Sequence, residues 1–393
     1  MRALLRTSVG KVAVGTVAAL FAGAAIGLVV LWPGPAQEVS LVAGARTQTQ
    51  QAEVVGSRPM ACRNPGASGC RRVTIELRSG QREGTRSFLT LGDAGPAPDV
   101  EPGAQLRVVR NEIPEGAQAG AVDPYALVEV DRRSPMLWLV LAFSALVIVF
   151  GRLRGALALV GLGASLLIVV EFVIPALLDG KAPVAVAIVG SFAVMLITIA
   201  LAHGLGPKSI AAILGTGASL VATVLLALLF TGLADLTGFS SEEATLLQAN
   251  DATLSLTGLV LAGMVIGALG VLDDVTVSQA STVMALRKAN PTQRAHELYL
   301  GAVSVGRDHV AATVNTLVLA YVGSSLPILL VFGIEGTAFA DTINREAVAE
   351  QVIAMLVGSI GLILAVPVTT LLAATLATRL PPEELDADAA HAH

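Results

Sequence analysis

The recurrence of long apolar stretches is the feature that most limits how this chain can fold. A bilayer core about 30 Å thick offers no water to backbone groups, so a helix needs about 20 mostly apolar residues to cross it. Eight stretches meet this requirement, which predicts a mainly α-helical membrane protein with eight transmembrane helices. They lie near 12–32, 135–151, 155–178, 183–203, 209–233, 254–272, 310–333 and 351–377, and each is bounded by Gly, Pro or charged residues.

The composition agrees with this class and excludes others. Hydrophobic residues make up 54% of the chain and charged residues only 14%, whereas a soluble domain carries about 25% charged residues. The net charge is −5 and no basic run is present, which excludes a nucleic-acid partner. The lipid bilayer is the partner that composition predicts.

The distribution of Lys and Arg over the short loops predicts the orientation of the chain. Apart from 33–134, eleven bases fall on the side that carries both termini, and two, Lys181 and Arg345, fall on the other. Since cytoplasmic loops carry the excess of bases, both termini are predicted to be cytoplasmic, with 33–134 and 234–253 outside. The eleven are Arg2, Arg6, Lys11, Arg152, Arg154, Lys208, Arg287, Lys288, Arg294, Arg307 and Arg379.

These helices divide the chain into four predicted regions. Residues 1–32 form an N-terminal transmembrane anchor, 33–134 an extracytoplasmic domain, 135–378 a seven-helix membrane domain and 379–393 a cytoplasmic tail. A cleaved signal peptide is the alternative for the first region, because bases precede its apolar stretch. An anchor is preferred, since the stretch is longer than the 7–15 residues usual for a signal peptide.

The segment 33–134 is predicted to be a small β-rich, barrel-like domain. Short alternating runs such as 72–77 and 105–109 are separated by Ser-Gly, Gly-Asp and Pro-Gly turns. Cys62 and Cys70 are the only cysteines in the chain, and outside the cytoplasm they predict a disulfide. The segment has no histidine, so neither a metal site nor a cofactor is expected there.

Two long runs, 267–281 (GALGVLDDVTVSQAS) and 306–327 (GRDHVAATVNTLVLAYVGSSLP), resemble the YibE/F family of bacterial membrane proteins. The Arg152-Leu-Arg-Gly-Ala segment, Ile174-Pro175 and the outer domain also resemble that family's plan. The resemblance implies a multi-span protein of the bacterial cytoplasmic (inner) membrane, of a kind often taken for a permease. It supplies no substrate and no catalytic residue. The Cys62–Cys70 insert departs from the family pattern.

Polar residues at membrane depth mark the places where function is expected, because they cost free energy unless paired or hydrated. Asp273 and Asp274 follow the sixth stretch, and Arg307 and Asp308 precede the seventh, which places all four at one boundary. Asn315 lies about 8 Å deeper. A pairing of Arg307 with one aspartate would leave the other as a proton relay or cation site. Alternatively, these are interfacial charges that end two helices.

A second group of polar residues is predicted nearer the outside. Glu171 on the third stretch and Ser324, Ser325 and Pro327 on the seventh lie at similar depth and are expected to meet. Pro327 lacks a backbone donor and so frees the carbonyl of Gly323, which resembles the broken helices of transporter sites. The alternative is a proline kink with serine hydroxyls bonded to their own helix and Glu171 reaching the interface.

Residues 273–290 mix apolar and polar side chains in a way that suits neither a span nor a free loop. The pattern predicts an amphipathic helix, lying flat on the membrane or re-entrant as a gate, that ends at Asn290-Pro291.

Three classes of function are compatible with these helices, polar residues and outer domain. The first is a proton- or ion-coupled permease for an unknown small solute, with a path between the third, sixth and seventh helices. The second is an envelope binding or scaffold protein that uses its outer domain. The third, an intramembrane enzyme using Asp273 and Asp274, is disfavoured because adjacent helical residues point about 100° apart, and no catalytic residue is assigned. The Gly263-Met-Val-Ile-Gly267 spacing also suits a homo-oligomer.

Overall fold

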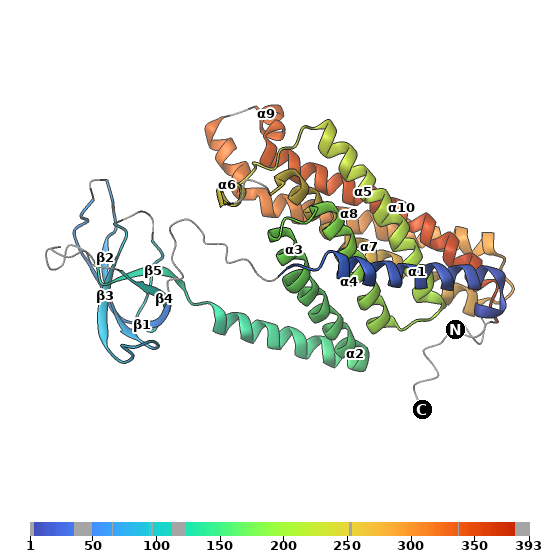
Figure 1. Cartoon of the computed structure of the whole chain (residues 1–393), viewed down its shortest axis with the longest axis horizontal. Coiled ribbons are helices and arrows are strands. Elements are labelled where there is room, and N and C mark those ends of the chain that lie inside the picture. Colours follow the sequence, from blue (N-terminus) through green and yellow to red (C-terminus); the bar gives the residue numbers. More distant parts are fainter. Residues whose placement is uncertain are drawn as a thin grey trace. The chain divides into compact units, whose positions relative to one another are not determined.

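The chain forms two compact units in the computed structural model, which describes residues 4–34, 49–64, 66–93, 95, 97–111, 123–250, 254–336 and 338–381. One unit comprises 1–38 and 147–393, and the other comprises 39–146. The first is a bundle of long helices. The second is a sheet domain followed by the start of helix α2 (Arg133–Ile168) (Figure 1).

The sheet domain is a curled antiparallel sheet of five strands. Its strand order is β3-β2-β1-β4-β5, and the register shifts in β1 after Val54 and in β4 after Arg107. Such bulges bend a strand and increase its twist. No ladder joins β3 to β5 among the described residues, so the predicted barrel is a curled sheet. The strands are β1 (Gln50–Pro59), β2 (Arg71–Leu77), β3 (Arg86–Leu91), β4 (Gln105–Arg110) and β5 (Tyr125–Val130).

The core of the sheet domain follows from the alternation along its strands. Successive side chains of a strand point to opposite faces, so every second residue enters the same core. In β2, Val73, Ile75 and Leu77 are fully buried. Leu89 of β3 and Leu106 of β4 join them in one apolar cluster.

The bundle consists of long apolar helices, and Figure 1 shows the start of α1 and the end of α10 at the same end of it. By length and composition, seven helices in the described part of the chain could cross a membrane, which indicates a membrane-embedded protein. A π-helical turn, Val169–Val173, follows α2 directly. The other helices are α1 (Ser8–Val30), α3 (Ile174–Leu178), α4 (Pro183–His203), α5 (Pro207–Leu233), α6 (Glu242–Asn250), α7 (Leu256–Ala289), α8 (Ala295–Glu335), α9 (Phe339–Asn344) and α10 (Glu346–Ala377).

Seven such helices, rather than the eight predicted, occur in the described residues because the second and third predicted stretches are joined. They form one helical stretch, Arg133–Leu178. Within it Arg152 has non-helical angles, with φ 53° and ψ −133°. A Cβ on Gly155 would lie 2.2 Å from the carbonyl oxygen of Val147. Residues eight apart cannot approach so closely in a straight helix. The chain therefore bends sharply at Arg152, and the number of crossings stays a prediction.

The prediction of a separate flat or re-entrant helix at 273–290 is wrong, because α7 continues through it to Ala289. The continuation buries one face, including Val275, Gln279 and Val283. That face lies against other helices instead of lipid, which explains its mixed composition. The predicted start of the seventh helix near Val310 is also wrong, since α8 begins at Ala295.

Close packing of α5, α7 and α10 forms the centre of the bundle, with α4 against α7 and α8 against α10. Small residues permit this approach. A Cβ on Gly215 of α5 would lie 2.0 Å from Thr369 Oγ1 of α10, and one on Gly361 of α10 would lie 2.1 Å from Thr223 Oγ1 of α5. These two contacts leave no room for a larger side chain.

Candidate functional site

A set of buried polar side chains runs through the centre of the bundle, and we call it the polar seam. Many of its hydroxyls are satisfied by their own helix. Thr216 donates to the carbonyl of Ala212 at 3.0 Å, and Thr223 donates to that of Ser219 at 2.9 Å. Such back-bonding lets a polar side chain lie inside a helical bundle. The members of the polar seam are Thr216, Thr223, Thr276, Gln279, Thr369 and Thr370.

Two contacts of the polar seam join different helices. The hydroxyls of Thr216 on α5 and Thr276 on α7 lie 2.5 Å apart. The side-chain amide of Gln279 on α7 donates to the carbonyl of Ala302 on α8 and to the hydroxyl of Thr370 on α10, each at 2.8 Å. Gln279 therefore ties α7 to two neighbouring helices.

Asp273 lies beside the polar seam and is the carboxyl group of greatest interest. The Thr198 hydroxyl of α4 donates to its Oδ2 at 3.2 Å, and the Thr276 hydroxyl donates to its backbone carbonyl at 3.1 Å. Its Oδ1 is buried and has no hydrogen-bond partner in the described part of the chain. A protonated carboxyl, or a carboxylate with a bound cation, would satisfy such an oxygen.

The depth of Asp273 differs from the prediction. It lies seventeen residues after Leu256, the first residue of α7, which is about 25 Å along the helix. The sequence predicts a position at a boundary because the sixth apolar stretch ends at Leu272. Since α7 continues, Asp273 instead lies near the middle of its helix.

The other members of the predicted inner group do not gather around Asp273. Asp274 is exposed on the adjacent face of α7, and the exposed residues of α8 include Arg307, Asp308 and Asn315. No ion pair between Arg307 and either aspartate occurs among the described residues. The residue that does reach Asp273 is Thr198, which sequence reasoning missed because a single hydroxyl in an apolar helix gives no signal.

The predicted outer group is also not brought together by any contact among the described residues. Glu171 is exposed within the π-helical turn. Pro175 follows four residues later and cannot donate to its carbonyl. Ser324 donates to the carbonyl of Tyr321 at 2.9 Å, within its own helix. For Ser324 this contact agrees with the alternative interpretation, in which the serine hydroxyls bond to their own helix beside a proline kink. A meeting of Glu171 with Ser325 and Pro327 stays a prediction.

A cavity of about 340 Å³ opens at the end of the bundle where α7 and α10 begin, and we call it the vestibule. Glu350 of α10 lines it and accepts a hydrogen bond from the Ser240 hydroxyl at 2.6 Å. Glu346 holds the neighbouring loop by accepting the backbone N–H groups of Thr237 and Gly238. The polar side chains that line the vestibule are Ser240, Ser241, Glu243, Tyr321, Glu350 and Gln351.

No pattern in the sequence predicts the vestibule. Glu350 and Gln351 lie at the start of α10, where they read as interfacial residues. Tyr321 lies far from them along the chain, in an otherwise apolar part of α8.

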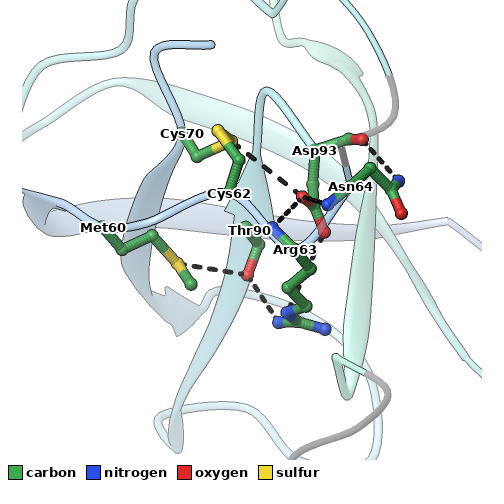
Figure 2. Close-up of a disulfide and its surroundings, with 7 residues drawn as sticks. All are labelled: Met60, Cys62, Arg63, Asn64, Cys70, Thr90 and Asp93. Carbon is green, nitrogen blue, oxygen red and sulfur yellow. Dashed lines mark hydrogen bonds and ion pairs between the residues drawn. A yellow bond between two sulfur atoms is a disulfide. The ribbon is translucent and has the colours of Figure 1, made fainter. Parts of the chain in front are cut away.

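The second polar cluster of the molecule lies in the sheet domain around the confirmed disulfide Cys62–Cys70 (Figure 2). The Asp93 carboxylate accepts the backbone N–H groups of Arg63 at 2.7 Å and Asn64 at 3.1 Å. Both residues belong to the loop that the disulfide closes. The contacts therefore fix this loop onto the end of β3.

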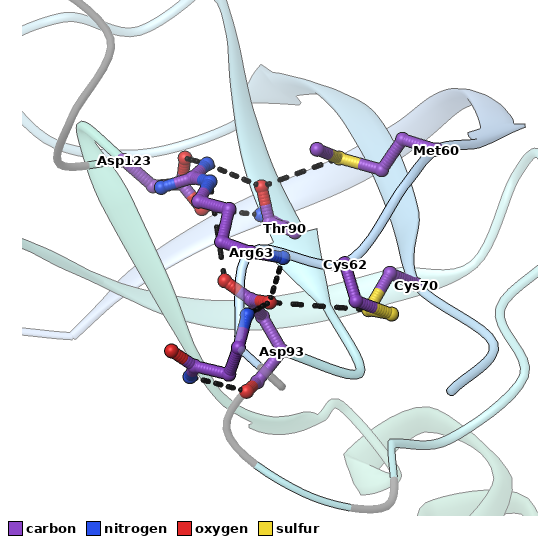
Figure 3. A network of polar contacts seen from close by, with 8 residues as sticks. Met60, Cys62, Arg63, Cys70, Thr90, Asp93 and Asp123 are labelled. Atoms are coloured by element: carbon purple, nitrogen blue, oxygen red, sulfur yellow. Dashed lines mark hydrogen bonds and ion pairs between the residues drawn. A yellow bond between two sulfur atoms is a disulfide. The ribbon is translucent and has the colours of Figure 1, made fainter. Parts of the chain in front are cut away.

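Arg63 extends the same cluster to the last strand (Figure 3). Its guanidinium contacts Asp123 at 2.6 Å, and Asp123 accepts the backbone N–H of Thr90 at 2.7 Å. Burial raises the pKa of Asp123, but the hydrogen bonds from Arg63 and Thr90 outweigh it and hold that pKa below its ordinary value. These charges are satisfied within the domain, which indicates a structural role.

Comparison with known proteins places the bundle in a family. A family profile described as YibE/F-like protein matches residues 139–379, about three fifths of the 393 residues. The match includes the polar seam, Asp273 and both runs that carried the resemblance, whereas the sheet domain lies outside it. Neither the curated proteins nor the solved structures give a match. The chain belongs to the YibE/F-like family of proteins.

Proposed function

We propose that this protein is a multi-pass permease of the bacterial cytoplasmic membrane, with both termini in the cytoplasm, that couples movement of a small solute to protons or another cation. The observation that carries the proposal is the buried Oδ1 of Asp273, which has no hydrogen-bond partner among the described residues. An ionisable group inside a membrane bundle is kept at a cost in free energy, which favours a functional role.

The chemistry of Asp273 suits an exchange between two states. In the ionised state, the Thr198 hydroxyl donates to Oδ2 and a cation or proton is needed at Oδ1. In the protonated state, the carboxyl can donate a hydrogen bond itself. The Thr198 hydroxyl can then turn to the carbonyls of Val194 or Met195, which lie 2.9 and 3.1 Å from it. One side chain thus serves both states.

The face of α7 between the vestibule and Asp273 supports a path. Gly263, Gly267, Gly270 and Asp274 follow one another at helical spacing on one face. A Cβ on Gly263 or Gly270 would meet no atom within 4 Å, and one on Gly267 would lie 3.7 Å from the Tyr321 hydroxyl. Tyr321 also lines the vestibule. We infer a path along this face in place of one beginning at Glu171.

Proteoliposomes loaded with the pH indicator pyranine test the proposal. An imposed membrane potential is combined with external Na⁺, Mg²⁺, Ca²⁺ or simple amines, and internal pH is followed. Asp273→Asn is expected to lower the proton flux at least tenfold, because the amide cannot exchange a proton. Asp341→Asn, at an exposed carboxyl group of α9 away from the inferred path, is the control and should stay within about twofold of the parent. A parent without flux, or an Asp273→Asn variant equal to the parent, would refute the coupling role.

The rival function, an envelope binding or scaffold protein, makes a different prediction for the same assay. Removal of residues 49–130 takes out strands β1 to β5 and keeps helices α1 to α10, so a permease should keep a measurable part of its flux. A binding protein would lose its cellular role on this deletion and keep it in Asp273→Asn. We do not propose an enzyme, since Asp273 is half-buried while Asp274 is exposed on another face.

A further inference from the structure

The outward face of α8 carries polar residues where a membrane-facing helix should be apolar. Only Leu298, Ala302, Gly306 and Phe332 of this helix are buried. On the opposite side, six residues at spacings of four and three are all exposed, and we call them the outer stripe. They are Asp308, Ala312, Asn315, Leu319, Val322 and Leu326.

The contacts of α8 with α10 fix the depth of this stripe. A Cβ on Gly306 would lie 2.6 Å from Val366, and one on Gly358 would lie 3.7 Å from Leu317. Asn315 lies between Gly306 and Leu317 along α8, so it is level with the part of α10 between 358 and 366. That part is the middle of α10, which runs from Glu346 to Ala377. Asn315 therefore lies at the middle depth of the bundle.

Lipid does not satisfy such side chains. At this depth an amide or a charge finds no water, so it must face protein or a hydrated cavity. No hydrogen bond or ion pair of the Arg307, Asp308 or Asn315 side chain occurs in the part of the chain that the structure describes. A further protein surface that covers the outer stripe would supply these missing partners.

We propose that the outer stripe of α8 binds the same stripe of a second copy, around a two-fold axis along the membrane normal. Arg307 flanks the outer stripe beside Asp308, is also exposed and carries the opposite charge. A symmetric contact therefore pairs Arg307 with the partner's Asp308 and Asp308 with the partner's Arg307. Asn315 meets Asn315 of the partner subunit at the axis. A single asparagine in such a stripe is known to fix the register and number of helices.

Two other segments of the chain fit the outer stripe less well than a second copy does. The tail 382–393 is acidic, so it offers partners to Arg307 but none of opposite charge to Asp308. The apolar stretch 135–151 carries one hydroxyl, that of Ser144, and no charge or amide. Neither segment offers partners to Arg307, Asp308 and Asn315 together, whereas a second copy does.

Cysteine cross-linking in native membranes tests the contact directly. Cys62 and Cys70 are paired in the disulfide, so an introduced cysteine is the one thiol expected to react. Asn315→Cys should give a covalent dimer with copper phenanthroline, and Ala312→Cys provides a second position on the stripe. Ala320→Cys is the control, about 140° around the helix from Asn315, and should give at least tenfold less dimer. Equal yields from the stripe and the control, or no dimer from either stripe position, would overturn the proposal.

Charge exchange tests the pairing and separates the rivals. Arg307→Asp and Asp308→Arg should each lower the dimer fraction, measured by energy transfer between labelled copies at fixed protein-to-lipid ratio, at least fivefold. The double exchange should restore it to within about twofold, which a merely destabilised helix would not show. Deletion of 382–393 should leave the cross-linking from Ala312→Cys unchanged. Failure of the double exchange to restore dimers, or loss of cross-linking on the deletion, would overturn the proposal.

Discussion

The sheet domain and the helical bundle differ in how they accommodate polar side chains. In the sheet domain, charged groups pair with one another near the surface, as Arg63 does with Asp123 and Arg78 with Glu53. Its interior is an apolar cluster formed by alternating strand residues. In the bundle, polar side chains lie in the interior, where hydroxyls such as those of Thr216 and Thr223 donate to carbonyls of their own helices.

This difference explains why one carboxyl group stands out from the others. A charged group at the edge of the sheet domain that loses its partner can still be hydrated. The Oδ1 atom of Asp273 cannot be hydrated in this way, because it is buried, and it lacks a hydrogen-bond partner among the described residues. Unsatisfied buried polar groups are rare in native proteins and call for an explanation. The contrast therefore points to the bundle for function and to the sheet-domain cluster for stability.

Loss of the disulfide should give the largest effect and should be confined to the sheet domain. The Cys62→Ser/Cys70→Ser double variant opens a loop with a sequence separation of 8 residues. Constraint of such a loop in the unfolded chain contributes about 2.5 kcal/mol. Hydrogen exchange of the full-length protein should show faster exchange in β2 and β3 and no change in α5, α7 and α10. Equal acceleration in both units would break the contrast, because it would mean that they unfold together.

Enlarging a small residue should destabilise the bundle somewhat less than loss of the disulfide destabilises the sheet domain. A Cβ on Gly361 would lie 2.1 Å from Thr223 Oγ1 and 3.4 Å from Thr223 Cβ. Gly361→Ala should therefore cost about 2 kcal/mol through overpacking, measured by thermal unfolding in detergent. Thr223→Ala should recover most of this loss in the double variant, because it removes the clashing oxygen.

The matched control for that variant is Gly163→Ala in α2, where a Cβ would meet no atom within 4 Å. It should be neutral or slightly stabilising, since alanine favours helix over glycine by about 1 kcal/mol. A double variant no more stable than Gly361→Ala alone would contradict the view that close glycine contacts hold α5 and α10 together.

Much of the fold follows from sequence patterns that act over short distances. Apolar stretches predicted the long helices, and alternating runs predicted the strands. The cysteine pair predicted the disulfide. The continuation of α7 was not predictable in this way, because Thr276 and Gln279 lower the hydropathy of a segment that lies inside the bundle. Their hydrogen bonds to other helices make that polarity tolerable.

The candidate site could be predicted only in part, for a related reason. Asp273 was singled out because a carboxyl group at membrane depth is costly whatever surrounds it. Arg307 was predicted to pair with one of the two aspartates, Asp273 or Asp274, whereas the contact that Asp273 makes in the structure is with Thr198. Which faces of α4 and α7 meet depends on packing between segments far apart in the chain. A single sequence does not record that packing.

The smallest expected effect is a pH dependence of the sheet domain that arises from Asp123. Because hydrogen bonds from Arg63 and Thr90 hold its pKa below the ordinary value, its contribution is complete above the unfolded pKa of about 3.9 and is lost as pH falls through the lower folded pKa. The sheet domain should lose about 1 kcal/mol on acidification below that value, seen as faster amide exchange in β3 and β5. Asp123→Asn should remove most of this dependence, while Asp99→Asn, at a position 80% exposed, should keep it. An unchanged pH dependence in Asp123→Asn would show that charge pairing does not stabilise the sheet domain, and the contrast with the bundle would then rest on packing alone.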